Sequence, residues 1–136
     1  MSRIYVLDAN AVLNLVEDAG GAERVEHLCQ DATRQGAPLL MSVVNWGEVF
    51  YYVWQRRGEE KARRTIGNLS RLPLDLVDVD LPQVLKAGEI KAVHKIPYVD
   101  CLAAALAEIR QAVLVTSDRD FEKLGHRVDV LWLQRS

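Results

Sequence analysis

The chain has 136 residues, of which 49% are hydrophobic and 26% are charged, and its formal net charge is -2. This size and composition predict a single soluble globular domain, residues 1-136, and exclude disordered and collagen-like architectures. No apolar run approaches the roughly 20 residues of a membrane span, and Asp8 comes too early for a signal-peptide core, so we expect a cytoplasmic protein.

Short apolar runs of β-type composition alternate along the chain with longer segments of helical spacing. The expected strands are Arg3 to Leu7, Leu39 to Met41, Leu74 to Val77, Val113 to Val115 and Val128 to Leu133. The expected helices are Gly21 to Arg34, Val43 to Arg57, Glu59 to Arg71, Leu81 to Val93 and Tyr98 to Arg110. This alternation predicts an α/β domain with a parallel sheet, and continuously apolar strands fit a sheet that is covered on both faces.

Several acidic residues fall where the predicted strands end or the helices begin. Asp8 ends the first strand, Asp118 and Asp120 follow the fourth, Asp100 opens a helix, and Glu48 lies near the second turn of another. In α/β folds these positions face a shared crevice. Each acid alone also has a simpler explanation, because a carboxylate can cap a helix, form a turn or lie in solvent.

Four or five carboxylates brought together repel one another unless they are protonated, solvated or joined by a cation. Ligands that are all oxygen, without clustered histidine or cysteine, favour Mg²⁺ or Mn²⁺ over Zn²⁺. Such a metal can orient or deprotonate water and neutralise charge on a phosphodiester. The acidic positions therefore indicate phosphate chemistry.

The sequence resembles the PIN-domain ribonucleases, and among them the VapC-like toxins of toxin-antitoxin modules, over the whole chain. The matching segments are Val6 to Asn10, Ser42 to Val49, Asp100 to Ala107 and Thr116 to Phe121. The resemblance implies a three-layer α/β domain whose five-stranded parallel sheet has the order 3-2-1-4-5, which places Asp8 beside Asp118. It also implies that a Mg²⁺- or Mn²⁺-dependent endoribonuclease leaves a 5′-phosphate and a 3′-hydroxyl on its RNA products.

By the same resemblance, Asp8, Glu48, Asp100 and Asp118 are the catalytic, metal-binding acids, and Asp120 is an additional metal ligand. Asn10 and Thr116 match supporting polar positions that orient a carboxylate or contact the scissile phosphate. The implied partners are an RNA substrate, a cognate antitoxin that occupies a groove near the site, and a second copy of the chain in a homodimer. One position departs from the family: Ala9 stands where a hydroxyl residue usually follows the first acid, so a supporting hydrogen bond is missing.

A basic segment, residues 56 to 71, is the best candidate for contact with RNA. It holds six cations against Glu59 and Glu60, a local charge of +4: Arg56, Arg57, Lys61, Arg63, Arg64 and Arg71. Cations on phosphates release counterions, so binding there should weaken with salt. The alternative is an ordinary solvated helix face.

Aromatic residues concentrate just before this segment. Trp46, Phe50 and Trp54 recur at helical spacing and predict a core stripe, whereas Tyr51 and Tyr52 share the face of Glu48 and can pack or stack on a base. Outside this region, Cys29 and Cys101 fit reduced packing thiols, and His27, His94 and His126 lack a catalytic spacing.

Two other function classes stay open. A PIN-like module that binds RNA or a partner without turnover is compatible with Ala9, and metal-dependent cleavage would separate it from a nuclease. A phosphoacceptor receiver domain has a similar length and acids at strand ends, but it needs adjacent acids after the first strand and a lysine after the last, whereas Ala9 and Gln134 stand there. Acyl-phosphate labelling would support that class.

Overall fold

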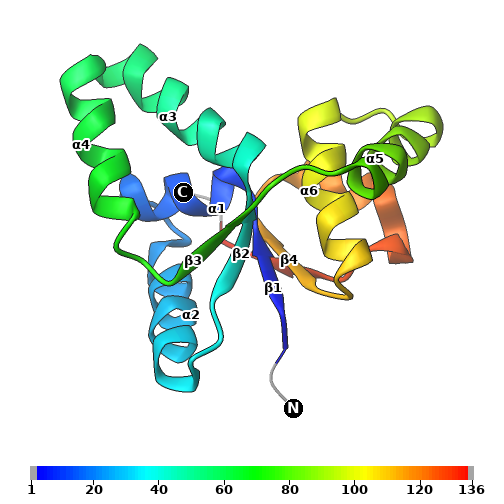
Figure 1. Ribbon diagram of the computed structural model, residues 1–136, viewed down its shortest axis with the longest axis horizontal. Helices are drawn as coiled ribbons and strands as arrows, with labels where there is room; N and C mark the ends of the chain where they lie inside the picture. The colour runs from blue at the N-terminus through cyan, green and yellow to red at the C-terminus, as the bar shows by residue number, and fades with distance from the viewer. Residues whose placement is uncertain (1–2, 135–136) are drawn as a thin grey trace.

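A computed structural model describes residues 3–134 as a three-layer α/β fold around one parallel sheet (Figure 1). The five strands lie in the order β3-β2-β1-β4-β5, and every neighbouring pair is parallel. Their bounds are β1 Tyr5–Leu7, β2 Leu39–Ser42, β3 Leu74–Val77, β4 Val113–Thr116 and β5 Val130–Trp132. The predicted fold class and strand order are confirmed.

Helices cover both faces of the sheet (Figure 1). Their bounds are α1 Ala9–Val16, α2 Ala22–Gln35, α3 Val43–Arg57, α4 Glu59–Leu69, α5 Leu81–Val93, α6 Tyr98–Ile109 and the 3-10 segment η1 Arg119–Arg127. None of the helices in the described part of the chain has the length and hydropathy needed to cross a lipid bilayer.

The central strand β1 has β2 on one side and β4 on the other, so the strand order reverses there. Val6 pairs with Leu40 of β2, and Leu7 pairs with Val115 of β4. The carboxyl ends of β1 and β4 are therefore neighbours, and the backbone N–H of Asp8 donates to the Val115 carbonyl at 3.4 Å. In open α/β sheets this switch point is where a crevice forms.

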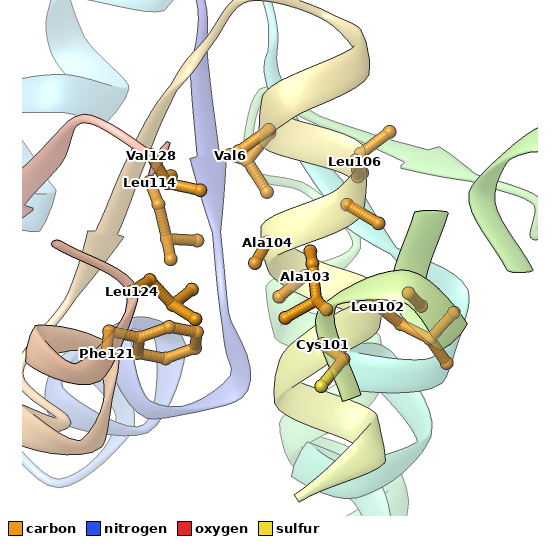
Figure 2. Close-up of a cluster of buried hydrophobic side chains, with 14 of the residues drawn as sticks. Val6, Cys101, Leu102, Ala103, Ala104, Leu106, Leu114, Phe121, Leu124 and Val128 are labelled. Carbon is orange, nitrogen blue, oxygen red and sulfur yellow. The ribbon is translucent and has the colours of Figure 1, made fainter. Parts of the chain in front are cut away.

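One hydrophobic cluster fills each face of the sheet. On one face α6 packs directly on β1, with Val6, Leu114, Leu124 and Phe121 around it (Figure 2). Seven consecutive residues of α6, Cys101 to Ala107, are buried, and most of them are alanines, which let the helix lie close to the sheet and to α5. On the other face α1, α2, the first half of α3 and the end of α4 pack against the sheet, and both cysteines are buried and free as predicted.

Two elements were not predicted, α1 and η1. Each begins at an acid that caps it: Asp8 accepts from the N–H of Ala11 at 2.8 Å, and Asp118 accepts from the N–H of Asp120 at 3.0 Å. In α1 the cap and a buried face hold a segment too short and too rich in asparagine and branched residues to be read as a helix.

The predicted core stripe of α3 is wrong in part. The buried residues of this helix are Asn45, Val49 and Val53, whereas Trp46 is half-buried against the core and Trp54 is exposed. The physical reason is the course of the chain, because the second half of α3 pairs with α4 in a hairpin away from the sheet (Figure 1).

Candidate active site

The predicted acids gather around the switch point, each positioned by a different element. Asp8 follows β1 and caps α1, and Asp118 follows β4 and caps η1. Asp100 lies in the first turn of α6, Asp120 in the first turn of η1, and Glu48 in α3 just after β2. We call these five residues the acidic cluster.

Three members of the acidic cluster lie within ligand distance of one another. Asp100, Asp118 and Asp120 each offer a carboxylate oxygen, and these atoms all lie within 4.8 Å of one another. Asp120 is also held by Lys123, whose Nζ lies 3.7 Å from Asp120 Oδ1. Like charges at this spacing repel one another, and a cation between them, a shared proton or solvation reduces that repulsion.

Asp8 is the most buried member, with 3% of its surface exposed. Its Oδ1 accepts from the Ala11 N–H at 2.8 Å, and its Oδ2 accepts from the Thr116 hydroxyl at 2.6 Å. These hydrogen bonds favour the charged form, but burial outweighs them, and the charges of Asp100 and Asp118 add to it, so the pKa of Asp8 rises to about 7.

Burial also raises the pKa of Asp100 to about 7, and the charges of Asp118, Glu48 and Asp120 contribute in that order. The pKa of Glu48 is raised by burial, although the Asn45 amide donates to its Oε1 at 2.8 Å and opposes the shift. Asp8 therefore interacts with Asp100 and Asp118, and Asp100 with the remaining acids, so the five residues share one electrostatic site.

This site fits a hard divalent cation. The donor set is all carboxylate oxygen, and no histidine or cysteine joins the close group of acids in the described residues. Two of the carboxyls are held near their protonation midpoint at neutral pH by burial and mutual repulsion, which a divalent charge would relieve.

Comparison with known proteins identifies the family. The description "PIN domain" matches residues 5–127. The chain belongs to the PIN domain family. No curated protein matches the sequence.

Solved structures with this fold include three toxin-antitoxin proteins. The VapBC2 complex from Rickettsia felis bound to a promoter DNA fragment has a TM-score of 0.76 and 20% identity, over 96% of this chain and 99% of that one. DNA-bound VapBC from Salmonella typhimurium has a TM-score of 0.74 and 21% identity, covering 96% and 98%. VapC20 of Mycobacterium tuberculosis, a toxin that cleaves the sarcin-ricin loop, has a TM-score of 0.64 and 17% identity, covering 89% and 95%. At these identities the likeness shows the fold.

The two supporting residues of this PIN domain occupy different places. Thr116 links two acids, because its hydroxyl donates to Asp8 and accepts from the Asp118 N–H at 2.9 Å. Asn10 instead holds the loop after β4, where its Oδ1 accepts from the N–H of Ser117 at 2.9 Å. Thr116 is thus in contact with the acidic cluster, and Asn10 acts on the backbone beside it.

Two polar residues near the PIN-domain site were not predicted from the sequence. Asn14 is buried, donates to Ser117 Oγ at 3.2 Å and accepts from the Gly21 N–H at 3.3 Å, so it joins α1 to two loops. Asn45 is buried beneath Glu48 and donates to it. The signal for both asparagines was present, because each stands where the apolar spacing of its helix calls for a core residue.

Ala9 does not leave Asp8 unsupported. The Asp8 side chain is held by Thr116 from β4 and by the first turn of α1, and Ala9 itself is buried at the start of that helix. The hydrogen bond that a hydroxyl at this position supplies is therefore not needed to fix the Asp8 rotamer.

The basic segment lies on the α3–α4 hairpin, and part of its charge is already paired. Arg63 binds Glu59 at 2.9 Å and Arg64 binds Glu60 at 3.0 Å. Three other cations line a hollow between α1 and the hairpin together with Val16, Glu17, Tyr52 and Val53: Arg56, Arg57 and Lys61. Tyr52 donates to Glu17 at 3.4 Å, and the Arg56 guanidinium lies 4.4 Å from the Tyr52 ring centroid.

Proposed function

We propose that this PIN domain is a metal-dependent endoribonuclease and the toxin of a type II toxin-antitoxin pair. The observation that carries the proposal is the acidic cluster at the switch point of the sheet, where two carboxyls have a pKa of about 7. Family membership and the likeness to VapBC structures support it. RNA is the favoured substrate because a protein of this fold is a sarcin-ricin loop cleaving toxin.

The residues that would hold Mg²⁺ or Mn²⁺ are Asp8, Glu48, Asp100, Asp118 and Asp120. When bound, such a metal supplies Lewis-acid chemistry, lowering the pKa of water and neutralising charge that builds on the phosphate. Thr116 fixes the rotamer of Asp8 and the position of Asp118 through its two hydrogen bonds. Lys123 places a positive charge 3.7 Å from Asp120 Oδ1 at the exposed side of the site.

The expected products carry a 5′-phosphate and a 3′-hydroxyl. Water then attacks phosphorus, the bond from phosphorus to O3′ breaks, and O3′ receives a proton. The side chain of Asp100 is partly exposed and can contact the attacking water, whereas both oxygens of Asp8 already accept hydrogen bonds.

We propose two protein partners. The hollow between α1 and the hairpin combines apolar walls with Arg56, Arg57 and Lys61, which suits a partly acidic antitoxin segment. Alternatively, the cations of the hairpin contact RNA, and these include Arg63 and Arg64. If a small protein encoded beside this gene neither co-purifies with the chain nor inhibits it, the antitoxin proposal is wrong.

The RNA contact is tested by the double variant Arg63→Ala with Arg64→Ala. If its RNA binding depends on salt as strongly as that of the parent, these two arginines do not contact RNA.

The second partner is another copy of the chain. The first turns of α5 expose Leu81 and Leu85, at 68% and 65% of their surface, with Val84 and Tyr98 beside them. An apolar stripe of this kind on a water-facing helix is typical of a protein interface. We propose that it forms the homodimer contact.

The test of the proposed function is cleavage of a labelled structured RNA by the purified chain freed of any partner. We expect cleavage with Mg²⁺ or Mn²⁺, none with chelator, and products with 5′-phosphate ends. Asp8→Asn and Asp100→Asn should each lower the rate by at least about 100-fold, because each removes a charged oxygen at little change in volume. Asp75→Asn, an exposed acid of the edge strand β3, is the matched control and should cleave like the parent.

Cleavage that survives in both cluster variants, or that persists in chelator, would contradict the proposal. A parent that binds RNA but does not cleave it with either metal would support the alternative, a PIN-like module without turnover. An acyl-phosphate on the protein would instead support the receiver class.

A further inference from the structure

Arg119 is a cation that stands in the sequence between two acids of the acidic cluster. Arg119 opens η1, and its sequence neighbours are Asp118 and Asp120. The phosphates of an RNA strand are repelled by the five carboxylates unless a cation lies between them. A positive side chain at this position is therefore of direct interest for substrate binding.

The Arg119 side chain is not used to neutralise the acidic cluster. Its guanidinium lies 4.5 Å from the centroid of the Trp132 ring. Within the described residues, its one ion pair is a long one, 3.8 Å to Glu122 Oε1. The cation that pairs with Asp120 is Lys123, which also donates to the Lys95 carbonyl at 3.1 Å. Arg119 retains 40% exposure of its side chain, so its donors remain open to a ligand.

Trp132 holds this arginine at the same edge of the sheet as the acids. Trp132 ends β5 in register with Thr116 of β4, and Thr116 donates to Asp8. The indole therefore lies one strand away from the residue that fixes the most buried acid. A guanidinium placed over an aromatic face loses less conformational freedom when it binds a phosphate.

An open hollow continues from Trp132 toward the start of α2. We call it the β5–α2 hollow, and its charged and polar lining comes from Glu23, Arg24, His27 and Gln134, so that its one acid is matched by an arginine. A second hollow borders the other side of Trp132, but its lining holds two acids, Glu122 and Asp129, and no arginine or lysine. The β5–α2 hollow is thus the more favourable path for a nucleic-acid strand.

We propose that Arg119, held over Trp132, binds a phosphate of the RNA next to the one that is cleaved, and that the strand continues into the β5–α2 hollow. This rests on the proposed function, because it names how the same site positions its substrate. Arg119 is a positioning residue here, since the acids carry the chemistry and the arginine fixes where the strand lies.

The test is binding of a labelled single-stranded RNA in chelator at several salt concentrations, together with steady-state cleavage of the same RNA. Arg119→Ala should weaken binding about tenfold, as one charge-assisted contact does, and lower the salt slope by about 0.7. It should raise KM with little change in kcat, because the contact is outside the reacting phosphate. Arg119→Lys should restore the slope but only part of the affinity, because lysine lacks the planar fork.

Two further variants separate this role from a structural one. Trp132→Leu should weaken binding less than Arg119→Ala while keeping the slope, because the charge stays and its support is lost. Arg34→Ala is the control and should bind RNA like the parent. Arg34 is exposed, pairs with Asp31, and lies at the end of α2, just before the amino end of β2 and so away from the carboxyl ends of the strands. Melting temperatures show whether any variant has lost its fold.

Unchanged RNA affinity and slope in Arg119→Ala would overturn the inference, and the nuclease proposal would stand if the parent still cleaves. A fall in kcat with unchanged KM would also overturn it. A parent that binds RNA through Arg119 without cleaving it would support the inference and contradict the nuclease. No RNA binding by the parent would overturn the inference, and if the parent also fails to cleave RNA with either metal, the nuclease proposal falls too.

Discussion

Buried acids set the energetics of this molecule at the scale of single residues. The pKa of Asp8 and of Asp100 is about 7, whereas both carboxyls titrate near 4 in an unfolded chain. The folded state therefore binds more protons than the unfolded state between these values. The contribution of these two carboxyls to stability is therefore greatest below the unfolded pKa and is lost as the pH rises through about 7.

Without metal, the melting temperature of the protein should depend on pH. In chelator, the melting temperature of the parent should fall as the pH rises from about 5 to about 8. Asp118→Asn should melt higher than the parent at the upper pH, because the Asp118 charge raises the pKa of both Asp8 and Asp100. Asparagine also caps helices well, so the start of η1 is preserved.

Thermal melting across this pH range, with Asp75→Asn as the control, gives the measurement. If Asp118→Asn melts lower than the parent at every pH, its carboxylate acts only as a cap and does not repel its neighbours. A melting temperature of the parent that does not change with pH would contradict the raised pKa of Asp8 and Asp100 in the folded state.

The sequence predicted which acids stand at strand ends, but it could not predict what surrounds them. Asp8 and Asp118 were found because an apolar run stops at each of them. The burial of Asp8, and its hydrogen bond from Thr116, depend on contacts 108 residues apart. Asn14 was overlooked because its helix, α1, was not predicted, and Asn45 because a polar residue on a predicted helix is expected to face solvent; both are buried.

At the scale of elements, helical spacing found the long helices and missed the short ones. The bounds of α3 and α5 agree with the prediction, since each has a cap and a periodic apolar face. In α1 and η1 the caps are carboxylates of the acidic cluster. Both segments have a weak local helix propensity, so tertiary contacts determine that they are helical.

The exposed apolar stripe of α5 can be tested as the proposed dimer contact. Leu85→Lys should convert the proposed dimer to monomer, because it places a charge in the centre of the apolar stripe, and it should leave the melting temperature nearly unchanged since Leu85 is 65% exposed. Light scattering after gel filtration gives the mass of each species. Val93→Lys, an equally exposed residue at the other end of α5, is the control.

A parent that is monomeric at high concentration would contradict the dimer. If Leu85→Lys remains dimeric, another surface forms the contact.

At the scale of the whole molecule, the strand order brings the acids together. Asp8 and Asp118 are far apart in the chain, and pairing of β1 with β4 makes their positions neighbours. Alternating apolar runs predicted a parallel sheet, but they carry no information on which strands pair. The order came from the resemblance to PIN domains, and the structure has it.

We propose that the acidic cluster forms one metal site, and Mn²⁺ binding followed by electron paramagnetic resonance measures this directly. We predict saturable binding to the parent that weakens from about pH 8 to about pH 6, because protons compete for Asp8 and Asp100. Asp118→Asn should weaken it at least about tenfold, and Asp75→Asn should not change it. A parent that binds no Mn²⁺, or an Asp118→Asn variant that binds as the parent does, would contradict the claim.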